Sequence, residues 1–270
     1  MVSLQPKGQG ERSVNSGPLL QLKEATIKFG GLTAVNKVSF DIVTGDLFGL
    51  IGPNGAGKTT CFNLITGVYK PTTGEILFKD KSIAGLPPHK IAERGICRTF
   101  QNIRLFGSLS CLENVVLGGF LRAKSPLASA LLHLPPAIKE SAELRVKALE
   151  LLEVVGLAED AETRSKDMPY GKQRRLEIAR ALATGPDLLL LDEPAAGMNP
   201  QEKEELAVTV RNIRDQFQKT VLLIEHDMRF VMGLCERIVV LDHGEEIAQG
   251  PPEAIRNDPK VIEAYLGEAV

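Results

Sequence analysis

The sequence predicts an α/β fold in which a mixed β-sheet core carries an inserted helical subdomain. Three observations lead to this prediction. Apolar and polar residues alternate over residues 20–51, as they do in half-buried strands. Continuous apolar runs at Leu47–Ile51, 188–191 and 221–224 are typical of strands that are buried on both faces of a parallel sheet. Between the first two runs, residues 103–183 follow a mostly helical pattern.

The N-terminal part begins with residues 1–18, which are polar and rich in Gly, Ser and Gln. They contain no apolar region of the kind found in signal peptides, and we interpret them as a disordered leader. In the alternating stretch that follows, Gly30-Gly31 marks a turn between two strands. The run Leu47–Ile51 leads directly into a glycine-rich loop. A helix should then extend to a stop near Gly67, followed by a short strand at residues 75–78.

Helical spacing is clearest over residues 144–155, where Leu144, Ala148, Leu151, Leu152 and Val155 form one apolar face before Gly156 ends the helix. We expect a further helix over residues 121–136, which is too short and too interrupted to span a membrane. Near the C-terminus, residues 237–249 resemble a hairpin that turns at Asp242-His243-Gly244. Two short helices within residues 252–266 should follow it.

Composition and charge argue against several classes of protein. The formal net charge of −2 argues against a nucleic-acid binder that uses a broad basic face. The four cysteines never form a CxxC pair, so a metal cage or a disulfide framework is not expected, and a reducing cytosol fits best. No stretch approaches the roughly 20 apolar residues that cross a bilayer. Work at a membrane would therefore require docking onto another protein.

The loop after the first buried run satisfies the pattern G-x-x-x-x-G-K-[ST]. Its glycines allow successive backbone N–H groups to point into one concavity, and the following helix adds its positive dipole end, which suits a phosphate. Lys58 can reach the β- and γ-phosphates of a nucleotide, and the Thr59 hydroxyl can ligate Mg²⁺. The alternative is a glycine-rich turn with an incidental lysine, and the flanking strand and helix argue against it. The loop reads Gly52-Pro53-Asn54-Gly55-Ala56-Gly57-Lys58-Thr59, with Thr60 after it.

Two carboxylates, Asp192 and Glu193, end the second buried run. Ligands of open α/β sheets bind at the carboxyl ends of the strands, so both side chains should lie at the ligand edge. We expect Asp192 to bind Mg²⁺ through water and Glu193 to act on the water that attacks the γ-phosphate. An acidic strand cap is the alternative for such a pair taken alone. His226, after the third run, is a candidate γ-phosphate contact, although a lone histidine at a strand end is more often a surface residue.

In order and spacing, these motifs resemble an ATP-binding-cassette (ABC) ATPase over nearly all of residues 20–266. The resemblance implies ATP hydrolysis with Mg²⁺ in an ABC nucleotide-binding domain at residues 19–250. Its helical subdomain would lie at about residues 103–183, and residues 251–270 would form a C-terminal helical extension.

Two single residues take their expected roles from the resemblance. Phe29 lies where the family has an aromatic residue that stacks on adenine, and a plain core phenylalanine is the alternative. Gln101 matches the family's glutamine that senses Mg²⁺ and the attacking water. Leu105 and Phe106, just after it, could form a socket for a membrane subunit's cytoplasmic helix or could pack inside the helical lobe.

The signature motif, which in the family closes over the γ-phosphate bound to the opposite subunit, departs here from the usual L-S-G-G-Q. Pro169 replaces a serine whose hydroxyl contacts phosphate in the family. The Gly171 backbone, a helix N-terminus and the charge of Lys172 remain, and we hypothesise that the helix dipole and Lys172 make up for this loss. Asn199 likewise stands where an aspartate is usual, in the loop after Glu193. The motif reads Met168-Pro169-Tyr170-Gly171-Lys172.

Within the family, the chain resembles one of the two ATPase subunits of bacterial importers for branched-chain amino acids. The supporting segments are residues 29–36, 98–101, 170–171, 193–200 and 264–267. Importers for amides or urea share parts of these segments and remain alternatives. The resemblance implies a second ABC ATPase subunit (or a homodimer), two transmembrane permease subunits and, indirectly, a substrate-binding protein. It also implies a peripheral location on the cytoplasmic face of the inner membrane.

Three other classes fit less well. ABC ATPases that act on nucleic acid or ribosomes typically carry two cassettes or a long coiled-coil insertion, for which 270 residues leave no room. A P-loop GTPase needs a guanine-reading N-K-x-D motif, and Asn36-Lys37-Val38-Ser39 lacks the final aspartate and precedes the loop. Glu193 argues against a regulatory subunit that does not hydrolyse its nucleotide.

Overall fold

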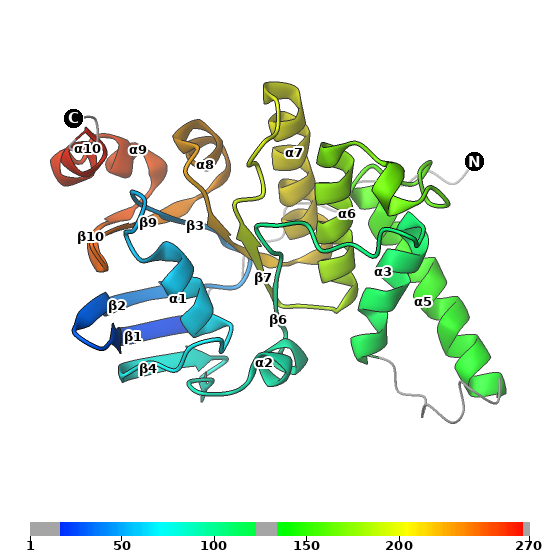
Figure 1. The fold of residues 1–270 in the computed structure, drawn as a ribbon, viewed down its shortest axis with the longest axis horizontal. Helices are drawn as coiled ribbons and strands as arrows, with labels where there is room; N and C mark the ends of the chain where they lie inside the picture. The colour runs from blue at the N-terminus through cyan, green and yellow to red at the C-terminus, as the bar shows by residue number, and fades with distance from the viewer. Residues whose placement is uncertain (1–16, 123–133, 267–270) are drawn as a thin grey trace.

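Two β-sheets form the centre of the molecule (Figure 1). The structure is a computed structural model and describes residues 17–122 and 134–266. One sheet has the strand order β10-β9-β3-β8-β7-β6, and the other has the order β2-β1-β4-β5. The strands are β1 Leu20–Phe29, β2 Leu32–Ile42, β3 Leu47–Ile51, β4 Thr73–Phe78, β5 Lys81–Ser82, β6 Ile96–Arg98, β7 Leu188–Asp192, β8 Thr220–Ile224, β9 Arg237–Asp242 and β10 Glu245–Gly250.

The six-stranded sheet separates two apolar cores. All residues of β3, β7 and β8 are buried, and alternate residues along each strand point to opposite faces. In β7, Leu189 and Leu191 contribute to one core, while Leu188 and Leu190 contribute to the other. Each fully buried leucine stabilises the fold by about 1.5–3 kcal/mol relative to an exposed one. The continuous apolar runs in the sequence follow from this burial on both faces.

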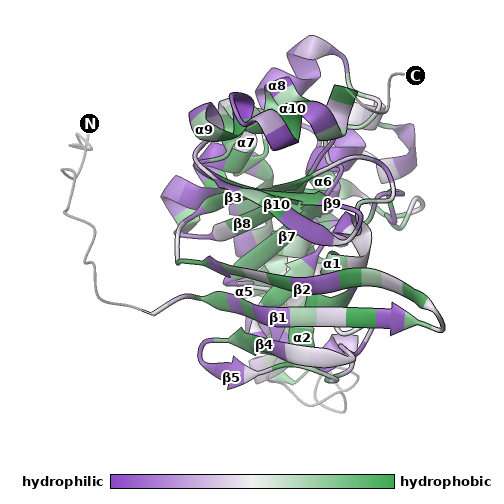
Figure 2. Cartoon of the chain, turned by 90° about the vertical axis from the view of Figure 1, so that its left-hand side faces the viewer, coloured by the Kyte–Doolittle hydropathy of each residue, from purple (hydrophilic) through white to green (hydrophobic). Residues whose placement is uncertain are grey.

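The four-stranded sheet and helix α1, Lys58–Ile65, cover one face of the six-stranded sheet and share its core. Figure 2 shows β1, β2 and β4 as a layer beneath the strands of the larger sheet. In β2, Val38, Phe40 and Ile42 are buried at alternate positions, as the period-two pattern predicts. The expected turn is present at Gly30-Gly31, where Phe29 pairs with Leu32.

Helices cover the other face of the large sheet. They include the helical region between β6 and β7, in which α3, α5 and α6 pack on one another. Helix α7 contacts β8, α8 packs over Gly49 of β3, and α9 and α10 follow β10 in the chain (Figure 1). The helices of this face are α3 Cys111–Gly119, α5 Pro135–Val154, α6 Tyr170–Ala183, α7 Pro200–Phe217, α8 Met228–Leu234, α9 Pro252–Arg256 and α10 Pro259–Leu266, with 3₁₀ turns η1 Phe120–Arg122 and η2 Ser165–Asp167. Helix α2, Pro88–Arg94, instead buries Ile91 in the core that α1 and the four-stranded sheet share.

Most predicted elements are confirmed, and some boundaries differ. The apolar face at residues 144–155 belongs to α5, which ends one residue before Val155. The helix expected over residues 121–136 is wrong at Leu134, which is extended at the N-cap of α5, because Pro135 begins that helix. Most of that stretch, and residues 1–16 of the leader, lie outside the described residues. The hairpin is confirmed, with His243 and Gly244 as its two turn residues at positive φ.

Asn199 has a local role that the sequence comparison with the usual aspartate did not indicate. Its side-chain oxygen accepts a hydrogen bond from the Glu202 backbone N–H at 3.0 Å. The Glu202 carboxylate in turn accepts from the Asn199 backbone N–H at 2.9 Å. This reciprocal capping box begins α7, and Pro200 at its first position fits the same start. Asparagine serves this cap as well as aspartate does.

Among the described residues, we find no helix with both the length and the apolarity that a bilayer crossing requires.

Candidate active site

The glycine-rich loop connects the buried strand β3 to helix α1, as predicted. Two of its glycines are required by close backbone contacts at positive φ. At Gly52 (φ 148°) a Cβ would lie 2.0 Å from the Leu241 carbonyl oxygen, and at Gly57 (φ 97°) it would lie 2.7 Å from the Ala34 carbonyl oxygen. The loop is therefore pressed against β9 and β2, and any side chain at these positions would displace it.

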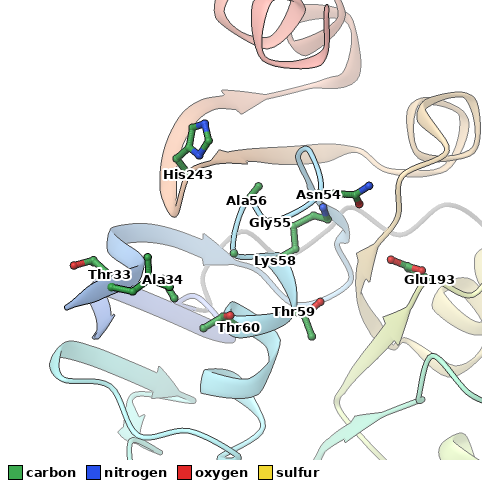
Figure 3. Close-up of a pocket in the computed structure, with 12 residues that line it drawn as sticks. Thr33, Ala34, Asn54, Gly55, Ala56, Lys58, Thr59, Thr60, Glu193 and His243 are labelled. Atoms are coloured by element: carbon green, nitrogen blue, oxygen red, sulfur yellow. The ribbon is translucent and has the colours of Figure 1, made fainter. Parts of the chain in front are cut away.

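The loop forms one wall of a cavity of about 390 Å³. Figure 3 shows the side chains around it, with Glu193 opposite the loop and His243 at its rim on the β9–β10 turn, where the imidazole is 94% exposed. The first turn of α1 carries no acidic residue, and no described side chain caps its N-terminus. An anion is the ligand that such a helix start favours. The lining residues are Leu32, Thr33, Ala34, Asn54, Gly55, Ala56, Gly57, Lys58, Thr59, Thr60, Glu193 and His243.

Lys58 is held inside the loop that it follows. Its side-chain ammonium donates hydrogen bonds of 2.6 Å to the carbonyl oxygens of Gly52 and Pro53, and the residue is only 7% exposed. Buried ammonium groups need partners, and these carbonyls stabilise the charge inside the cavity wall. The loop thus presents a fixed positive charge and a helix N-terminus at one point, an arrangement that fits the phosphates of a nucleotide.

Asp192 and Glu193 lie at the carboxyl edge of the large sheet, beside the loop. Strands β3, β8 and β7 are parallel, and both Asp192 and Leu50 pair with Ile224 of the strand between them. The end of β3 and the end of β7 are therefore level. The Asp192 carboxylate is buried and accepts a 2.6 Å hydrogen bond from the guanidinium of Arg98. The same guanidinium donates to the Asn63 side chain in α1 at 2.7 Å.

Glu193 lines the cavity, and its carboxylate contacts the side chain of Gln101. The Gln101 side-chain nitrogen donates a 2.9 Å hydrogen bond to the Glu193 carboxylate. Gln101 reaches this position because β6 pairs with β7, with Arg98 opposite Leu190. Glu193 adopts φ 46°, a conformation that costs a non-glycine residue of order 1–3 kcal/mol and that clusters at functional sites. Its backbone N–H is fixed by the Ile224 carbonyl oxygen at 2.9 Å.

Other predicted residues lie away from the cavity wall. Phe29 is 45% exposed and makes an edge contact with Tyr69, at 5.1 Å between ring centroids. It is therefore not a core phenylalanine. The imidazole of His226 is 60% exposed, with its Nδ1 3.8 Å from the Glu225 carboxylate. Leu105 packs against the core, as the second alternative predicts. Phe106 is 53% exposed, and the predicted socket stays a prediction.

The signature residues also lie away from this cavity. They form the start of α6, which begins at Tyr170, with Pro169 as its N-cap. The Lys172 ammonium pairs with the Asp160 carboxylate of the same chain at 2.7 Å. Gly171 is buried, and a Cβ there would lie 2.6 Å from the Glu202 carboxylate at the start of α7. In the single chain, the charge of Lys172 is thus compensated locally.

Sequence reasoning missed His243 and Glu225. The turn that carries His243 is joined to the cavity wall, because Gly244 donates to the Ala56 carbonyl oxygen at 3.1 Å and accepts from the Asn36 N–H at 2.7 Å. Glu225 is buried and accepts from the Ala195 N–H at 2.7 Å and from the His226 N–H at 3.1 Å, which ties together the loops after β7 and β8. The sequence placed His243 only in a hairpin turn and gave Glu225 no role, because the contacts of both residues depend on the tertiary fold.

The loop, the strand-end carboxylates and the helical region can be compared with known proteins. A family model described as "ABC transporter" matches residues 35–196. The chain belongs to the ABC transporter family. A model described as "Branched-chain amino acid ATP-binding cassette transporter" matches residues 245–270 of this ABC chain. The expectation that the sequence resemblance raised about the family is confirmed.

Relatives and solved structures agree with this membership of the ABC family. The chain is 48% identical to the high-affinity branched-chain amino acid transport ATP-binding protein LivG of Escherichia coli, over 94% of this chain and 100% of LivG. It resembles the ADP conformation of an ATP-binding cassette of an ABC transporter with a TM-score of 0.81 and 32% identity, over 93% and 100% of the two chains. A dimeric ATP-binding cassette in a post-hydrolysis state, bound to ADP and Pi, is similar with a TM-score of 0.71 and 27% identity, over 86% and 98%.

Proposed function

We propose that this chain is the ATP-hydrolysing subunit of an ABC importer for branched-chain amino acids. The observation that carries the proposal is the position of Glu193, which lines one cavity together with the phosphate loop and accepts a hydrogen bond from Gln101. This arrangement places a carboxylate that can accept a proton beside an anion site. The cargo is inferred from LivG, which is named for branched-chain amino acid transport, and from the family match at residues 245–270.

In this proposal, the triphosphate of ATP is held by the Lys58 ammonium and by backbone N–H groups of the loop at residues 52–60, in which Pro53 provides none. The adenine stacks on Phe29, whose ring is exposed. Phe29 pairs across the β1–β2 turn with Leu32, which lines the cavity. Base–aromatic stacking contributes roughly 1–3 kcal/mol. His243, on the opposite wall, is a further candidate contact to the nucleotide.

Hydrolysis would use three side chains around the γ-phosphate. Glu193 accepts a proton from the attacking water or polarises it, and Gln101 orients that water while it fixes the Glu193 carboxylate. His226, on the loop after β8, contacts the γ-phosphate once the site closes. Thr59, Gln101 and Asp192 would hold Mg²⁺, with Asp192 acting through water, and the ion would supply neutralisation of phosphate charge.

A second ABC ATPase subunit, or a second copy of this chain, would complete each nucleotide site. The start of α6 at Tyr170 and Gly171 would face the γ-phosphate held by the other subunit, as a helix N-terminus suited to an anion. Lys172 would add charge there after leaving Asp160. The dimeric cassette with ADP and Pi, which this chain resembles, supports such an arrangement.

Two transmembrane permease subunits would receive the movement, with this chain peripheral on the cytoplasmic face of the inner membrane and a substrate-binding protein on the other side. The surface beside Gln101 supports this proposal. A cavity of about 460 Å³ there is lined by the exposed rings of Phe100 and Phe106, together with Leu117 and Arg180. A cavity lined by apolar rings and one arginine could bind a short helix of a permease subunit.

The test uses the complete complex, with the chain co-purified with its permease and partner ATPase and placed in vesicles with the substrate-binding protein. Leucine, isoleucine or valine should stimulate ATP hydrolysis, whereas urea or short amides should not. Glu193→Gln should reduce turnover by at least about 100-fold and leave ATP binding intact, because the change removes the proton acceptor alone. Stimulation by urea in place of leucine would overturn the cargo, and absence of ATP binding would overturn the whole proposal.

A further inference from the structure

Arg174 is the largest fully buried side chain among the described residues, and it lies between the helical region and the active site. It is the fifth residue of α6, four positions after Tyr170. Its guanidinium donates hydrogen bonds of 2.7 Å to two consecutive carbonyl oxygens, those of Phe100 and Gln101. Arginine is rarely buried completely unless its donors are paired. The main chain at Gln101 is thus one of the groups that keep this charge inside the protein.

Glu177, one turn further along α6, completes the cluster. Its carboxylate pairs with Arg174 at 2.9 Å and is 2% exposed. The same carboxylate lies 3.4 Å from the Arg104 backbone N–H and 3.5 Å from the Phe100 backbone N–H, as their acceptor. One helix therefore binds carbonyl oxygens and N–H groups of the same short loop. Because α6 binds both N–H groups and carbonyl oxygens of residues 100–104, we expect this loop to move together with α6.

Tyr170 links the cluster to the start of the signature helix. Its hydroxyl oxygen lies 2.9 Å from an Arg174 nitrogen and accepts a hydrogen bond from it. Its ring lies beside Gly197, in the loop after Glu193, where a Cβ would be 3.5 Å from the ring. Arg174 therefore contacts both the first residue of α6 and the loop whose glutamine side chain binds Glu193. Nothing in the sequence motifs indicated that these segments share one buried residue.

We propose that Arg174 is a positioning residue that fixes the Gln101 loop to the signature helix, so that the amide of Gln101 meets Glu193 only when α6 is in place. The inference rests on the proposed ATPase function and deepens it. Arg174 touches no nucleotide, and it acts through the two carbonyl oxygens. Movement of the helical region is thereby transmitted to the orientation of the attacking water without any contact between α6 and that water.

The first test is a double-mutant cycle in the assembled complex. Single loss of a buried charge risks unfolding, so the variant is the neutral pair Arg174→Gln with Glu177→Gln, which leaves no uncompensated charge. We expect kcat to fall about tenfold or more while the KM for ATP changes less than about twofold, as for an orienting group. Gln101→Ala should have a similar effect, and the combined variant should be no worse than Gln101→Ala alone.

The matched control is Arg175→Gln on the same helix. Arg175 is partly buried and contacts the Val155 carbonyl oxygen and Glu205, away from the Gln101 loop. Its effect should multiply with that of Gln101→Ala, because the two residues share no partner. If the reduction in kcat of the combined variant equalled the product of the reductions caused by the neutral pair and by Gln101→Ala, the positioning role would be overturned. Residues that act through one another give non-multiplicative effects.

The second test needs no turnover. Amide hydrogen exchange in residues 99–106 of the nucleotide-free complex should be at least about tenfold faster in the neutral pair variant and unchanged in Arg175→Gln. Unchanged exchange in the neutral pair variant would show that Arg174 does not hold the loop. If the wild-type complex failed to hydrolyse ATP, the proposed function would be wrong, whereas this measurement would still decide the placement of the loop by Arg174.

Discussion

The guanidinium of Arg98 lies 2.6 Å from the carboxylate of Asp192, at the point where two parallel strands end side by side. Arg98 also donates to Asn63 of α1, so one side chain joins the phosphate-loop helix to the strand that carries both acidic residues. The pair is shielded, with side-chain exposures of 14% and 5%. Arg98 binds one carboxylate oxygen of Asp192 and thereby orients the other carboxylate oxygen.

Replacing Arg98 by alanine should destabilise the chain by about 3 kcal/mol, because it leaves a buried carboxylate without its cation. Urea unfolding of the purified chain measures this change. The matched control is Lys79→Ala, which removes the exposed pair Lys79–Asp187 and should cost less than about 1 kcal/mol. Equal losses in the two variants would mean that the Arg98–Asp192 pair is solvated in solution.

A pair of glycines in the phosphate loop should respond differently to alanine. At Gly52 a Cβ would overlap the Leu241 carbonyl oxygen, so Gly52→Ala should displace the loop and abolish nucleotide binding. At Gly55 no atom lies within 4 Å of the Cβ position, so Gly55→Ala should cost only the left-handed backbone penalty, about 1–2 kcal/mol, and retain binding. Calorimetric titration with ATP distinguishes the two, and binding by Gly52→Ala would contradict the packing of the loop against β9.

Lys172 and Asp160 should have opposite effects on turnover. Lys172→Ala should slow hydrolysis in the assembled complex and leave ATP binding to the isolated chain intact, if the residue acts, as we propose, on the opposite subunit's nucleotide. Asp160→Asn should maintain or raise turnover, since it releases the Lys172 ammonium from its 2.7 Å partner. Steady-state ATPase rates of the complex measure both. A loss of activity in Asp160→Asn equal to that in Lys172→Ala would show that the ion pair itself is the required element.

Phe29 should determine the affinity for the base and leave the affinity for the phosphates unchanged. Phe29→Ala should weaken ATP binding by about tenfold, within the roughly 1–3 kcal/mol of base–aromatic stacking. Binding of inorganic tripolyphosphate should be unaffected, and Phe29→Trp should restore ATP binding. If Phe29→Ala weakened tripolyphosphate equally, the ring would support the fold of the β1–β2 turn and would not contact adenine.

Glu225 predicts a pH dependence of stability. Burial raises the pKa of its carboxyl above the ordinary 4.5, against the lowering effect of the backbone N–H groups of Ala195, His226 and Asp227. A raised pKa in the folded state means that this contribution to stability is complete below pH 4.5 and is lost as the pH rises through the folded pKa.

The free energy of unfolding of the wild type should therefore fall relative to that of Glu225→Gln as the pH rises above 4.5, through the raised pKa of Glu225 in the folded state. Urea unfolding at several pH values gives this difference, and the exposed Glu263→Gln serves as the control. A difference that stays constant with pH would mean that Glu225 titrates equally in the folded and unfolded chains.

The sequence predicted the strands and loops whose signal is local. The three buried runs became β3, β7 and β8, because burial on both faces requires apolar residues at every position. The turn at His243-Gly244 followed from two residues suited to positive φ. Strand β6 was missed, because three residues are too few to form a pattern, and it is recognisable as a strand only through its pairing with β7.

In the candidate site, too, residues in local motifs were predicted and residues that depend on tertiary contacts were not. The phosphate loop is contiguous in the sequence, so Lys58 and Thr59 could be assigned from their spacing. Arg174 and Glu225 could not, because their role depends on carbonyl oxygens and N–H groups of distant segments, which any residue provides. Lys172 was assigned to phosphate from its place in the motif. The ion pair with Asp160, twelve residues earlier, became visible only in the folded chain.

The large sheet ends on one side at β6, which offers only the main chain of Ile96–Arg98. So short an edge cannot serve as a template for a foreign strand, and it protects the protein from edge-to-edge aggregation. Because β6 ends at Arg98, a neighbouring chain that paired with this edge strand would not bind residues 99–106. A partner that contacts this edge would therefore bind side chains of the loop. The main chain of residues 99–106 would then stay free of the partner and could move together with α6.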